Sequence, residues 1–190
     1  MIYAFRSWRV ELDRLANDLR TTIDHLNNLE RLKPEKAGIL KQAAFGSLVF
    51  EYHDSLLKSF LLSALILRKM DDAAKYPFPA GKMKASKLDR QLAKRLKDYS
   101  FESYVGAEEG GDQKSVRIIE GRQYSGRDVS NLAIHSEEMR LFDFPYDEQN
   151  GFWIRSDERP DKDNSKLFWF LNLDDYLPML DDFRHDPWKD

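Results

Sequence analysis

Apolar residues recur at steps of three and four positions through residues 7–32. The members of this series are Trp8, Leu12, Leu15, Leu19, Ile23, Leu26 and Leu29. An α-helix completes one turn about every 3.6 residues, so these positions fall on one stripe of an amphipathic helix. Ser7 is suited to the N-cap, and Pro34 cannot continue the pattern. The spacing therefore predicts a helix from Ser7 to Leu32.

The segment after Pro34 is apolar on more than one side. It reads PEKAGILKQAAFGSLVFEYHDSLLKSFLLSALILRKMDD, and Pro34 is suited to the first turn of a helix from about Glu35 to Met70. Its apolar residues cover more than half of the helix circumference. Exposing a second apolar face to water would leave a large hydrophobic patch, so the pattern predicts the central helix of a bundle.

Polar residues interrupt the middle of this second helix. They are Glu51, His53, Asp54 and Lys58. Asp54 and Lys58 form an (i, i+4) pair in the favourable orientation. One interpretation is a solvated strip on an otherwise buried helix. The other is a polar cluster that lines a cleft or a dimer seam, because buried charges persist when they are paired or used.

A third helix is predicted from Ser86 to Tyr99, after a turn-rich link. Its inner face is apolar, and Ser86 with Asp89 resembles a capping box. This region is rich in cations: Lys82, Lys84, Lys87, Arg90, Lys94, Arg95 and Lys97. We call these seven residues the basic segment. It is either a solvated helix face or a surface that contacts the phosphates of RNA.

The remainder of the chain has a weaker pattern. Glycine and charge favour a flexible loop over Gly106–Gln113, and a short strand is predicted over Val116–Ile119, followed by a turn at Ser125 and Gly126. Alternating and β-branched residues predict strands over Phe152–Arg155 and Leu167–Leu171.

A last helix is predicted with Asn172 as its cap. We therefore expect residues 1–145 to form a helical bundle domain. Residues 146–190 are expected to form a β-hairpin and a terminal helix packed on the same core. The fold class is mainly α.

Composition narrows the possible functions. A chain of 190 residues suits one domain, and 42% hydrophobic with 33% charged residues indicates a globular core. The net charge of −3 offers nucleic acid no long-range attraction, so such binding needs a local basic surface. The absence of cysteine excludes disulfides and thiolate chemistry and fits a reducing compartment.

The sequence predicts a cytoplasmic protein without a membrane segment. The N-terminus becomes charged too early for a secretory signal, and the most apolar run, Ser59–Leu67, is far shorter than the roughly 20 residues that cross a bilayer. We also expect neither metal nor cofactor. Asp181 and His185 share a helical spacing but supply only two ligands, and nucleotide-binding and hydrolase motifs are absent.

The stretch SNLAIHSEE, residues 130–138, is the candidate for chemistry. It places Asn131 four residues before His135. In one interpretation, residues 128–144 include a helix that carries both side chains on one face. In the other, the stretch forms a strand, a turn and a strand, and His135 lies at a surface bend beside Glu137 and Glu138.

The helical pattern, the segment LKQAAFGSLVFEYHDSLLKSF and the Asn-x-x-x-His spacing resemble the HEPN superfamily of prokaryotic conflict systems over about residues 1–140. The resemblance implies an HEPN-like helical bundle that forms a homodimer and cleaves RNA without metal. In that family an arginine, commonly next to the asparagine, acts with the histidine. Asn131 and His135 match, whereas Ser130 stands in the arginine position. The nearest upstream arginine, Arg127, lies about 80° around a helix from His135.

Metal-free RNA cleavage requires an acid, a base and positive charge for the phosphorus centre. Histidine serves the first two roles near neutral pH, but serine supplies no charge. The resemblance thus implies a weak or inactive endoribonuclease of a defence or toxin–antitoxin system. His135 would be the acid and base, Asn131 the positioning group and Arg127 a phosphate contact. The alternative is a non-enzymatic immunity, inhibitor or scaffold component that binds a protein partner through Trp153, Trp169 and Trp188.

Overall fold

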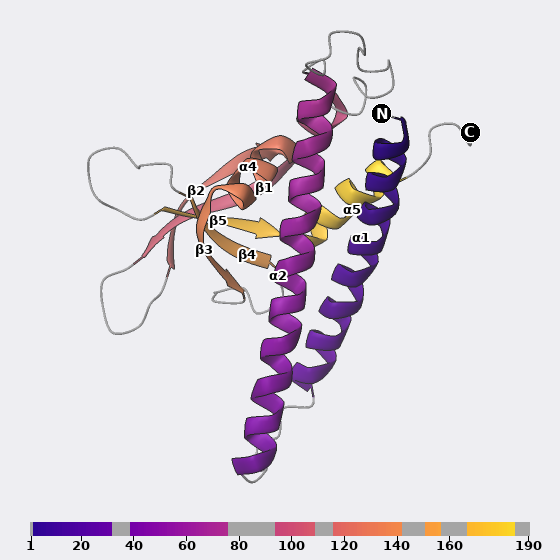
Figure 1. The fold of residues 1–190 in the computed structure, drawn as a ribbon. Helices are drawn as coiled ribbons and strands as arrows, with labels where there is room; N and C mark the ends of the chain where they lie inside the picture. The colour runs from indigo at the N-terminus through magenta and orange to yellow at the C-terminus, as the bar shows by residue number, and fades with distance from the viewer. Residues whose placement is uncertain are drawn as a thin grey trace.

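The structure is a computed structural model that describes residues 2–31, 39–75, 94–108, 116–141, 151–156 and 167–184. The described chain is mostly helical, with an antiparallel sheet in its C-terminal half (Figure 1). A short helical segment, residues 94–98, precedes the first strand. The elements are α1 (Ile2–Arg31), α2 (Ile39–Lys75), β1 (Ser100–Glu108), β2 (Val116–Ser125), α4 (Gly126–Ile134), β3 (Ser136–Leu141), β4 (Gly151–Ser156), β5 (Leu167–Asn172) and α5 (Leu173–Arg184).

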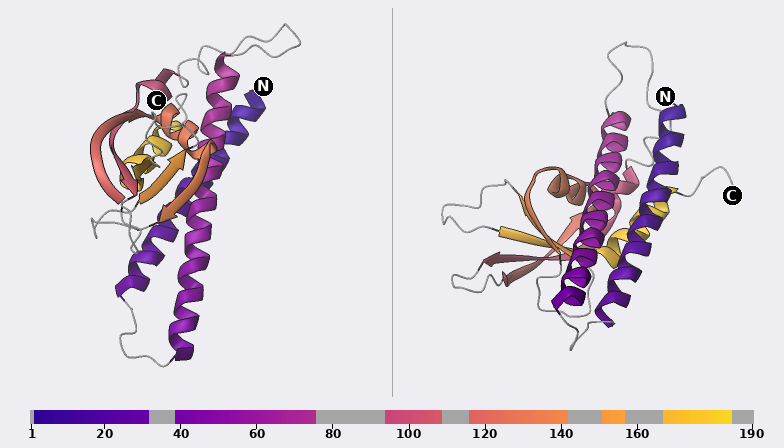
Figure 2. Two further views of the ribbon diagram at one scale, coloured as in Figure 1. Left: turned by 90° about the vertical axis from the view of Figure 1, so that its left-hand side faces the viewer. Right: turned by 60° about the horizontal axis from the view of Figure 1, so that its bottom comes forward.

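Helices α1 and α2 lie side by side and run in opposite directions (Figures 1 and 2). The apolar stripe predicted for α1 is confirmed. Its buried members are Leu12, Leu15, Leu19, Ile23 and Leu26. Helix α1 begins at Ile2, earlier than predicted, so Ser7 lies inside the helix and is not its N-cap.

Helix α2 packs against α1 and also against α4, as its broad apolar surface predicted. Leu56, Phe60, Ala64 and Leu67 are fully buried on this helix. Helix α2 is the longest helix among the described residues. One of its sides is exposed to solvent, so other elements do not enclose it completely. Among the described residues, no helix combines the length and apolar character needed to cross a membrane.

The five strands form one sheet in the order β2-β1-β5-β4-β3, and all neighbours are antiparallel. The prediction of a loop from Gly106 was wrong for residues 106–108, which belong to β1. Gly106 pairs with Ile118 of β2 and Phe168 of β5, next to a register shift after Val105. Glycine is tolerated there because strands on both sides hold the backbone. Residues 109–113 of the expected loop lie outside the described residues.

The sheet crosses the boundary expected at residue 145. Strands β1, β2 and β3 precede it and β4 and β5 follow it, yet β5 pairs with β1 and β4 pairs with β3. The sequence predicted a helical bundle with one short strand for residues 1–145, and this part in fact also contributes β1 and β3 to the sheet. Three of the sheet's strands come from that part. Local periodicity did not reveal them all, because strand pairing depends on long-range contacts.

The two faces of the sheet bury different side chains. Val105, Phe152, Ile154, Trp169 and Leu171 join the main core with the helices. On the other face, Trp153, Phe168 and Phe170 form a smaller cluster, and the guanidinium of Arg140 stacks over the Phe168 ring at 4.7 Å. Trp153 and Trp169 are thus core residues and not the anchors of an exposed interface. Trp188 lies outside the described residues.

Helix α5 begins after Asn172, as predicted, and the Asn172 Oδ1 accepts a hydrogen bond from the Asp174 backbone N–H at 2.9 Å. Tyr176 of this helix is fully buried against α2. Its hydroxyl and that of Ser63 share a hydrogen bond of 2.8 Å, and Ser63 also donates to the Phe60 carbonyl. The phenol therefore joins α5 to the middle of α2.

Burial raises the pKa of Tyr176 far above its usual range, and the Ser63 bond opposes this shift only in part. In the folded protein the Tyr176 phenol is therefore favoured in its neutral form. Stability from this group is therefore complete below the unfolded pKa of about 10 and falls by up to about 1.4 kcal/mol per pH unit above it. We expect Tyr176→Phe to lose about 1 kcal/mol at pH 7 but to show a shallower decline in alkali. Urea unfolding of the wild type and the variant from neutral to alkaline pH measures the loss at pH 7 and the alkaline decline. If the free energy of unfolding falls equally steeply with alkaline pH in both proteins, the buried neutral phenol is not the cause.

Candidate functional site

Helix α4 starts with a complete capping box. The Asp128 backbone N–H donates to Ser125 Oγ at 3.2 Å, and the Ser125 N–H donates to Asp128 Oδ2 at 3.0 Å. A Cβ atom at Gly126 would lie 2.7 Å from Leu96 Cδ1, so glycine permits close packing there. The turn predicted at Ser125 and Gly126 is the junction where β2 ends at Ser125, the N-cap, and α4 begins at Gly126.

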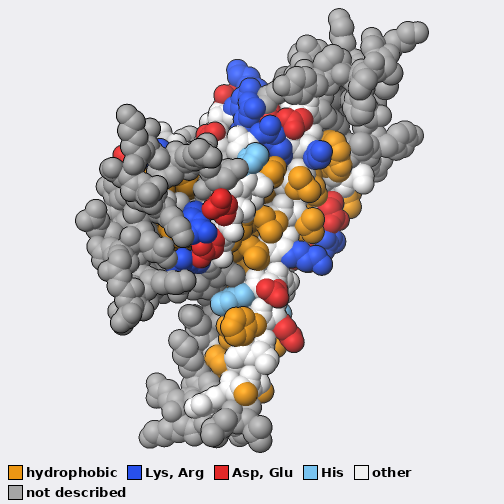
Figure 3. Space-filling view, turned by 60° about the vertical axis from the view of Figure 1, so that its left-hand side comes forward, with side chains coloured by type: hydrophobic (Ala, Val, Ile, Leu, Met, Phe, Trp, Pro, Cys, Tyr) orange, Lys and Arg blue, Asp and Glu red, His pale blue; other side chains and the backbone are white. Residues whose placement is uncertain are grey.

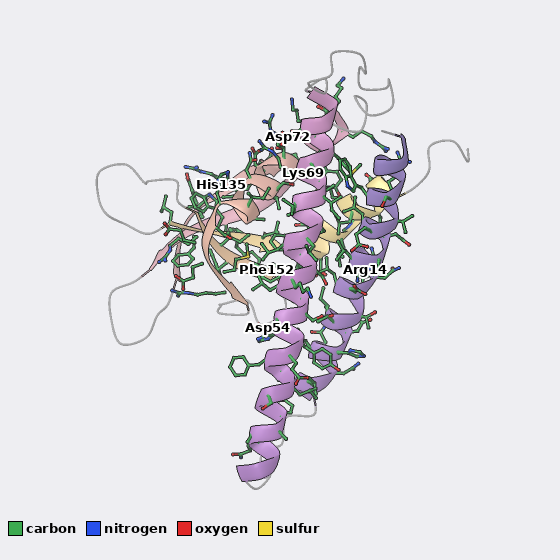
Figure 4. The ribbon with its side chains drawn as sticks, in the orientation of Figure 1. Arg14, Asp54, Lys69, Asp72, His135 and Phe152 are labelled. Carbon is green, nitrogen blue, oxygen red and sulfur yellow. The ribbon has the colours of Figure 1, made fainter. Side chains whose placement is uncertain are left out.

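Residues 130–138 combine parts of the two interpretations that the sequence left open. Residues 126–134 are helical, and β3 begins at Ser136. His135 is the C-cap between them, and its backbone N–H donates to the Asn131 carbonyl at 3.0 Å. The side chain of His135 is exposed and that of Asn131 is half-buried. Figure 4 shows His135 at the sheet side of α2, away from the α1 side.

Ser130 faces the core of the molecule. Its side chain is fully buried and its Oγ donates to the Gly126 carbonyl at 2.9 Å. This is the position at which the HEPN resemblance places an arginine. A guanidinium there would have to enter the core, so position 130 offers no route to a phosphate at the surface.

Arg127 has a structural partner. Its Nε lies 3.4 Å from Asp71 Oδ2, and the Asp71 side chain is fully buried. A buried carboxylate requires a compensating charge, so withdrawing Arg127 toward a substrate would be costly. Arg127 therefore joins α4 to α2 through an ion pair, and its role as a phosphate contact stays a prediction.

Arg68 supplies the guanidinium that the sequence did not place. This residue near the C-terminal end of α2 donates from Nη1 to Asn131 Oδ1 and from Nε to Asp72 Oδ2, the latter at 3.1 Å. Asn131 lies one helical turn before His135. The pairing joins residues 63 positions apart, which explains why local spacing did not reveal it. The only sequence signal was an arginine at the end of an apolar run.

The described part of the basic segment lies at the other end of α4. Lys94, Arg95 and Lys97 are exposed, while Leu96 between them is buried against Gly126. Helix α4 has nine residues and is thus about 13 Å long, which separates these cations from His135. Lys82, Lys84, Lys87 and Arg90 lie outside the described residues.

The polar residues in the middle of α2 do not join this site. Glu51, Asp54 and Lys58 are exposed and His53 is partly buried. Asp54 lies about 21 Å along the helix axis from Arg68, and Figure 4 shows Asp54 far from His135. The three charged side chains are exposed in the single chain, as a solvated strip would be, and the cleft or dimer seam stays a prediction.

The described side chains hold no group of three histidine, aspartate or glutamate residues arranged for a metal ion. Asp181, one of the two residues weighed as ligands, forms an ion pair with Arg20 at 2.5 Å. His185 lies outside the described residues. The candidate site consists of Arg68, Asp72 and Asn131, with His135 one helical turn after Asn131. The ion pair of Asp71 with Arg127 joins the same two helices, α2 and α4.

Comparisons with known proteins add no relative. No family model matches the sequence, and searches of curated proteins and of solved structures found no match.

Proposed function

We propose that this chain is an HEPN-like protein of a prokaryotic defence or toxin–antitoxin system that acts on RNA, with weak or no metal-independent endoribonuclease activity. The HEPN-like part would be the helical region built on α1 and α2 and ending with α4. RNA would bind at the candidate site, and the protein would need neither metal nor cofactor for its chemistry.

The observation that supports this proposal is the contact between Arg68 and Asn131, one helical turn before the exposed His135. The contact brings a guanidinium to the amide of Asn131, on the turn of α4 before His135, which carries the imidazole. These are the groups that metal-free cleavage of a phosphodiester requires: a proton donor and acceptor, a positioning group and a cation.

In this site His135 would take the proton of the attacking 2′-hydroxyl and return one to the leaving oxygen. Asn131 would position the phosphate. The contacts to Asn131 and Asp72 use two of the five N–H donors of Arg68, whose guanidinium would face the extra negative charge.

The charges around the site explain why we expect the activity to be weak. Arg68 and Arg127 are balanced by Asp71 and Asp72, which lie within ion-pair distance of them. A site without net positive charge gives limited stabilisation to a phosphorus centre that gains negative charge.

Cleavage of a single-stranded RNA in the presence of EDTA tests the proposal. We expect His135→Ala to lower the rate by a hundredfold or more, and Arg68→Ala by about tenfold to a hundredfold. His25→Ala and Arg14→Ala are matched controls, because both residues are exposed on α1 and far along the chain from the site. If His135→Ala and His25→Ala change the cleavage rate equally, the proposed nuclease activity is ruled out.

RNA binding as a function of salt separates an inactive RNA-binding protein from a protein with no role on RNA. Each lost phosphate contact lowers the slope of log affinity against log salt by about 0.7 for a single strand. We expect Arg68→Ala to reduce this slope. A wild-type protein that neither binds nor cleaves RNA at low salt overturns the proposal and favours the protein-binding alternative.

A further inference from the structure

Three aliphatic side chains lie beside the candidate site, on the solvent side of α2 and α4. Leu65 is 42% exposed and Ile134 is 41% exposed, while Leu61 is half-buried. We call these three residues the aliphatic shelf. Figure 3 shows hydrophobic side chains gathered on this side of the molecule among basic and acidic ones. Aliphatic side chains that are exposed together mark a binding surface more often than isolated ones do.

The aliphatic shelf adjoins the candidate site because of the way α4 lies along α2. The ion pair and the hydrogen bond between the two helices show that they run antiparallel. Leu65 precedes Arg68 by three residues, and Ile134 follows Asn131 by three residues. Both aliphatic side chains therefore lie about one helical turn from the contact between Arg68 and Asn131, at nearly the same level. Leu61 lies one turn further along α2.

Two cations stand at the end of the aliphatic shelf. Arg68 is three and Lys69 four residues after Leu65, and side chains at these spacings are neighbours on a helix. Lys69 is exposed, and the Arg68 guanidinium is held by Asp72 and Asn131. An aliphatic surface thus ends at a guanidinium and an ammonium group.

A nucleotide has the two chemical properties that match this surface. Its phosphate is an anion, and the two faces of its base are flat and largely apolar. A protein partner fits less well, because three side chains cover much less than the roughly 800 Å² per partner of a standard stable interface. The chemistry and the size of the surface therefore favour a nucleotide.

We infer that one base of an unpaired RNA strand packs on the aliphatic shelf while a neighbouring phosphate of the same strand contacts Arg68. The inference rests on the proposed function and adds the part of the RNA that the shelf recognises. In a duplex, stacking covers the faces of the bases and the deep, narrow major groove excludes side chains, so the base must be unpaired. A purine buries more apolar area than a pyrimidine and should bind about threefold more tightly.

Fluorescence anisotropy with 2′-O-methyl strands measures this contact, because such strands lack the attacking hydroxyl and stay intact. The strands have equal length and charge. They carry adenine, uracil or no base at one central position, and all other positions are abasic. We expect adenine to bind about threefold more tightly than uracil, and uracil about threefold more tightly than the strand without a base. The salt dependence should be equal for the three strands, because the bases are uncharged.

Variants of the shelf locate the contact. Leu65→Gln keeps a good helix former and should weaken binding of the adenine strand about fivefold, without affecting the strand that lacks a base. Leu65→Phe should tighten binding of the adenine strand, since bases stack on aromatic rings. Arg68→Ala should weaken binding of all three strands and reduce their salt dependence. Leu48→Gln is the matched control, because Leu48 is 38% exposed on the same helix, about 26 Å from Leu65 along its axis.

Two outcomes would overturn the inference and leave the RNA proposal in place. In the first, the strand without a base binds as tightly as the adenine strand. In the second, Leu65→Gln binds the adenine strand as tightly as Leu48→Gln does, which would leave the aliphatic shelf to a protein partner. A wild-type chain that binds none of the three strands also overturns the inference, and its binding of ordinary single-stranded RNA then decides whether the proposed function fails as well.

Discussion

Phe60→Ala is expected to lower the free energy of unfolding by about 3–5 kcal/mol. The Phe60 side chain is fully buried in the middle of α2. Its ring centroid lies 4.8 Å from that of Phe152 on β4 and 5.1 Å from that of Tyr176 on α5. Truncation would leave a cavity where helix, sheet and terminal helix meet, and the neighbouring rings cannot collapse into it without moving two elements.

Phe50→Ala on the same helix is the control. Phe50 is 72% exposed, so the same chemical change should alter stability by no more than about 0.5 kcal/mol. Urea denaturation followed by circular dichroism compares the two variants. Similar losses for both would show that the described packing of α2 against β4 and α5 is not the source of stability.

Arg127→Ala is expected to destabilise the protein by about 2–3 kcal/mol, toward the low end for a broken buried ion pair because Arg127 is partly exposed. The loss arises because the fully buried Asp71 carboxylate loses a compensating charge. Combining Arg127→Ala with Asp71→Asn should restore more than half of the loss, since the buried charge is then absent. Chemical denaturation of the single and double variants gives the coupling energy.

Arg14→Ala is the matched control for this ion pair. Arg14 contacts Glu11 and Asp18 at 2.5 Å, but the side chains of all three are well exposed. Exposed pairs contribute little, so a change of about 0.5 kcal/mol or less is expected. A double variant of Arg127 and Asp71 that is no more stable than Arg127→Ala would contradict the structural role assigned to this pair.

The two arginines near the candidate site have different structural roles. Arg127 holds α4 on α2 through its ion pair with Asp71, whereas Arg68 contacts Asn131 near the exposed histidine. A loss of RNA activity in an Arg127 variant is therefore expected to follow the loss of fold. A loss in an Arg68 variant should appear in protein whose unfolding curve is nearly unchanged.

The elements that sequence predicted well are those with strong local signals. The α1 stripe repeats over many turns, and β4, β5 and α5 are introduced by turn or cap residues such as Gly151 and Asn172. Strand β1 was missed because its glycine and acidic residues are typical of a loop. It is a strand because β2 and β5 pair with both of its edges, which no local pattern encodes.

The candidate site divides in the same way. The spacing of Asn131 and His135 was visible in the sequence, and the structure places them on successive turns at the end of α4. The partners of the site were not visible. Asp71 and Arg68 come from α2, and Arg68 stands 63 residues before the asparagine that it contacts.

The sequence by itself determined the local properties of this protein: two long helices, a terminal helix, several strands and a net charge that excludes general attraction to nucleic acid. These depend on residues a few positions apart, so periodicity and caps reveal them. Only the tertiary structure decided the strand order, the burial of Ser130, the inward role of Arg127 and the approach of Arg68. Each of these depends on which distant segments share one core, and that is decided by the total of burial and hydrogen bonding over the whole chain.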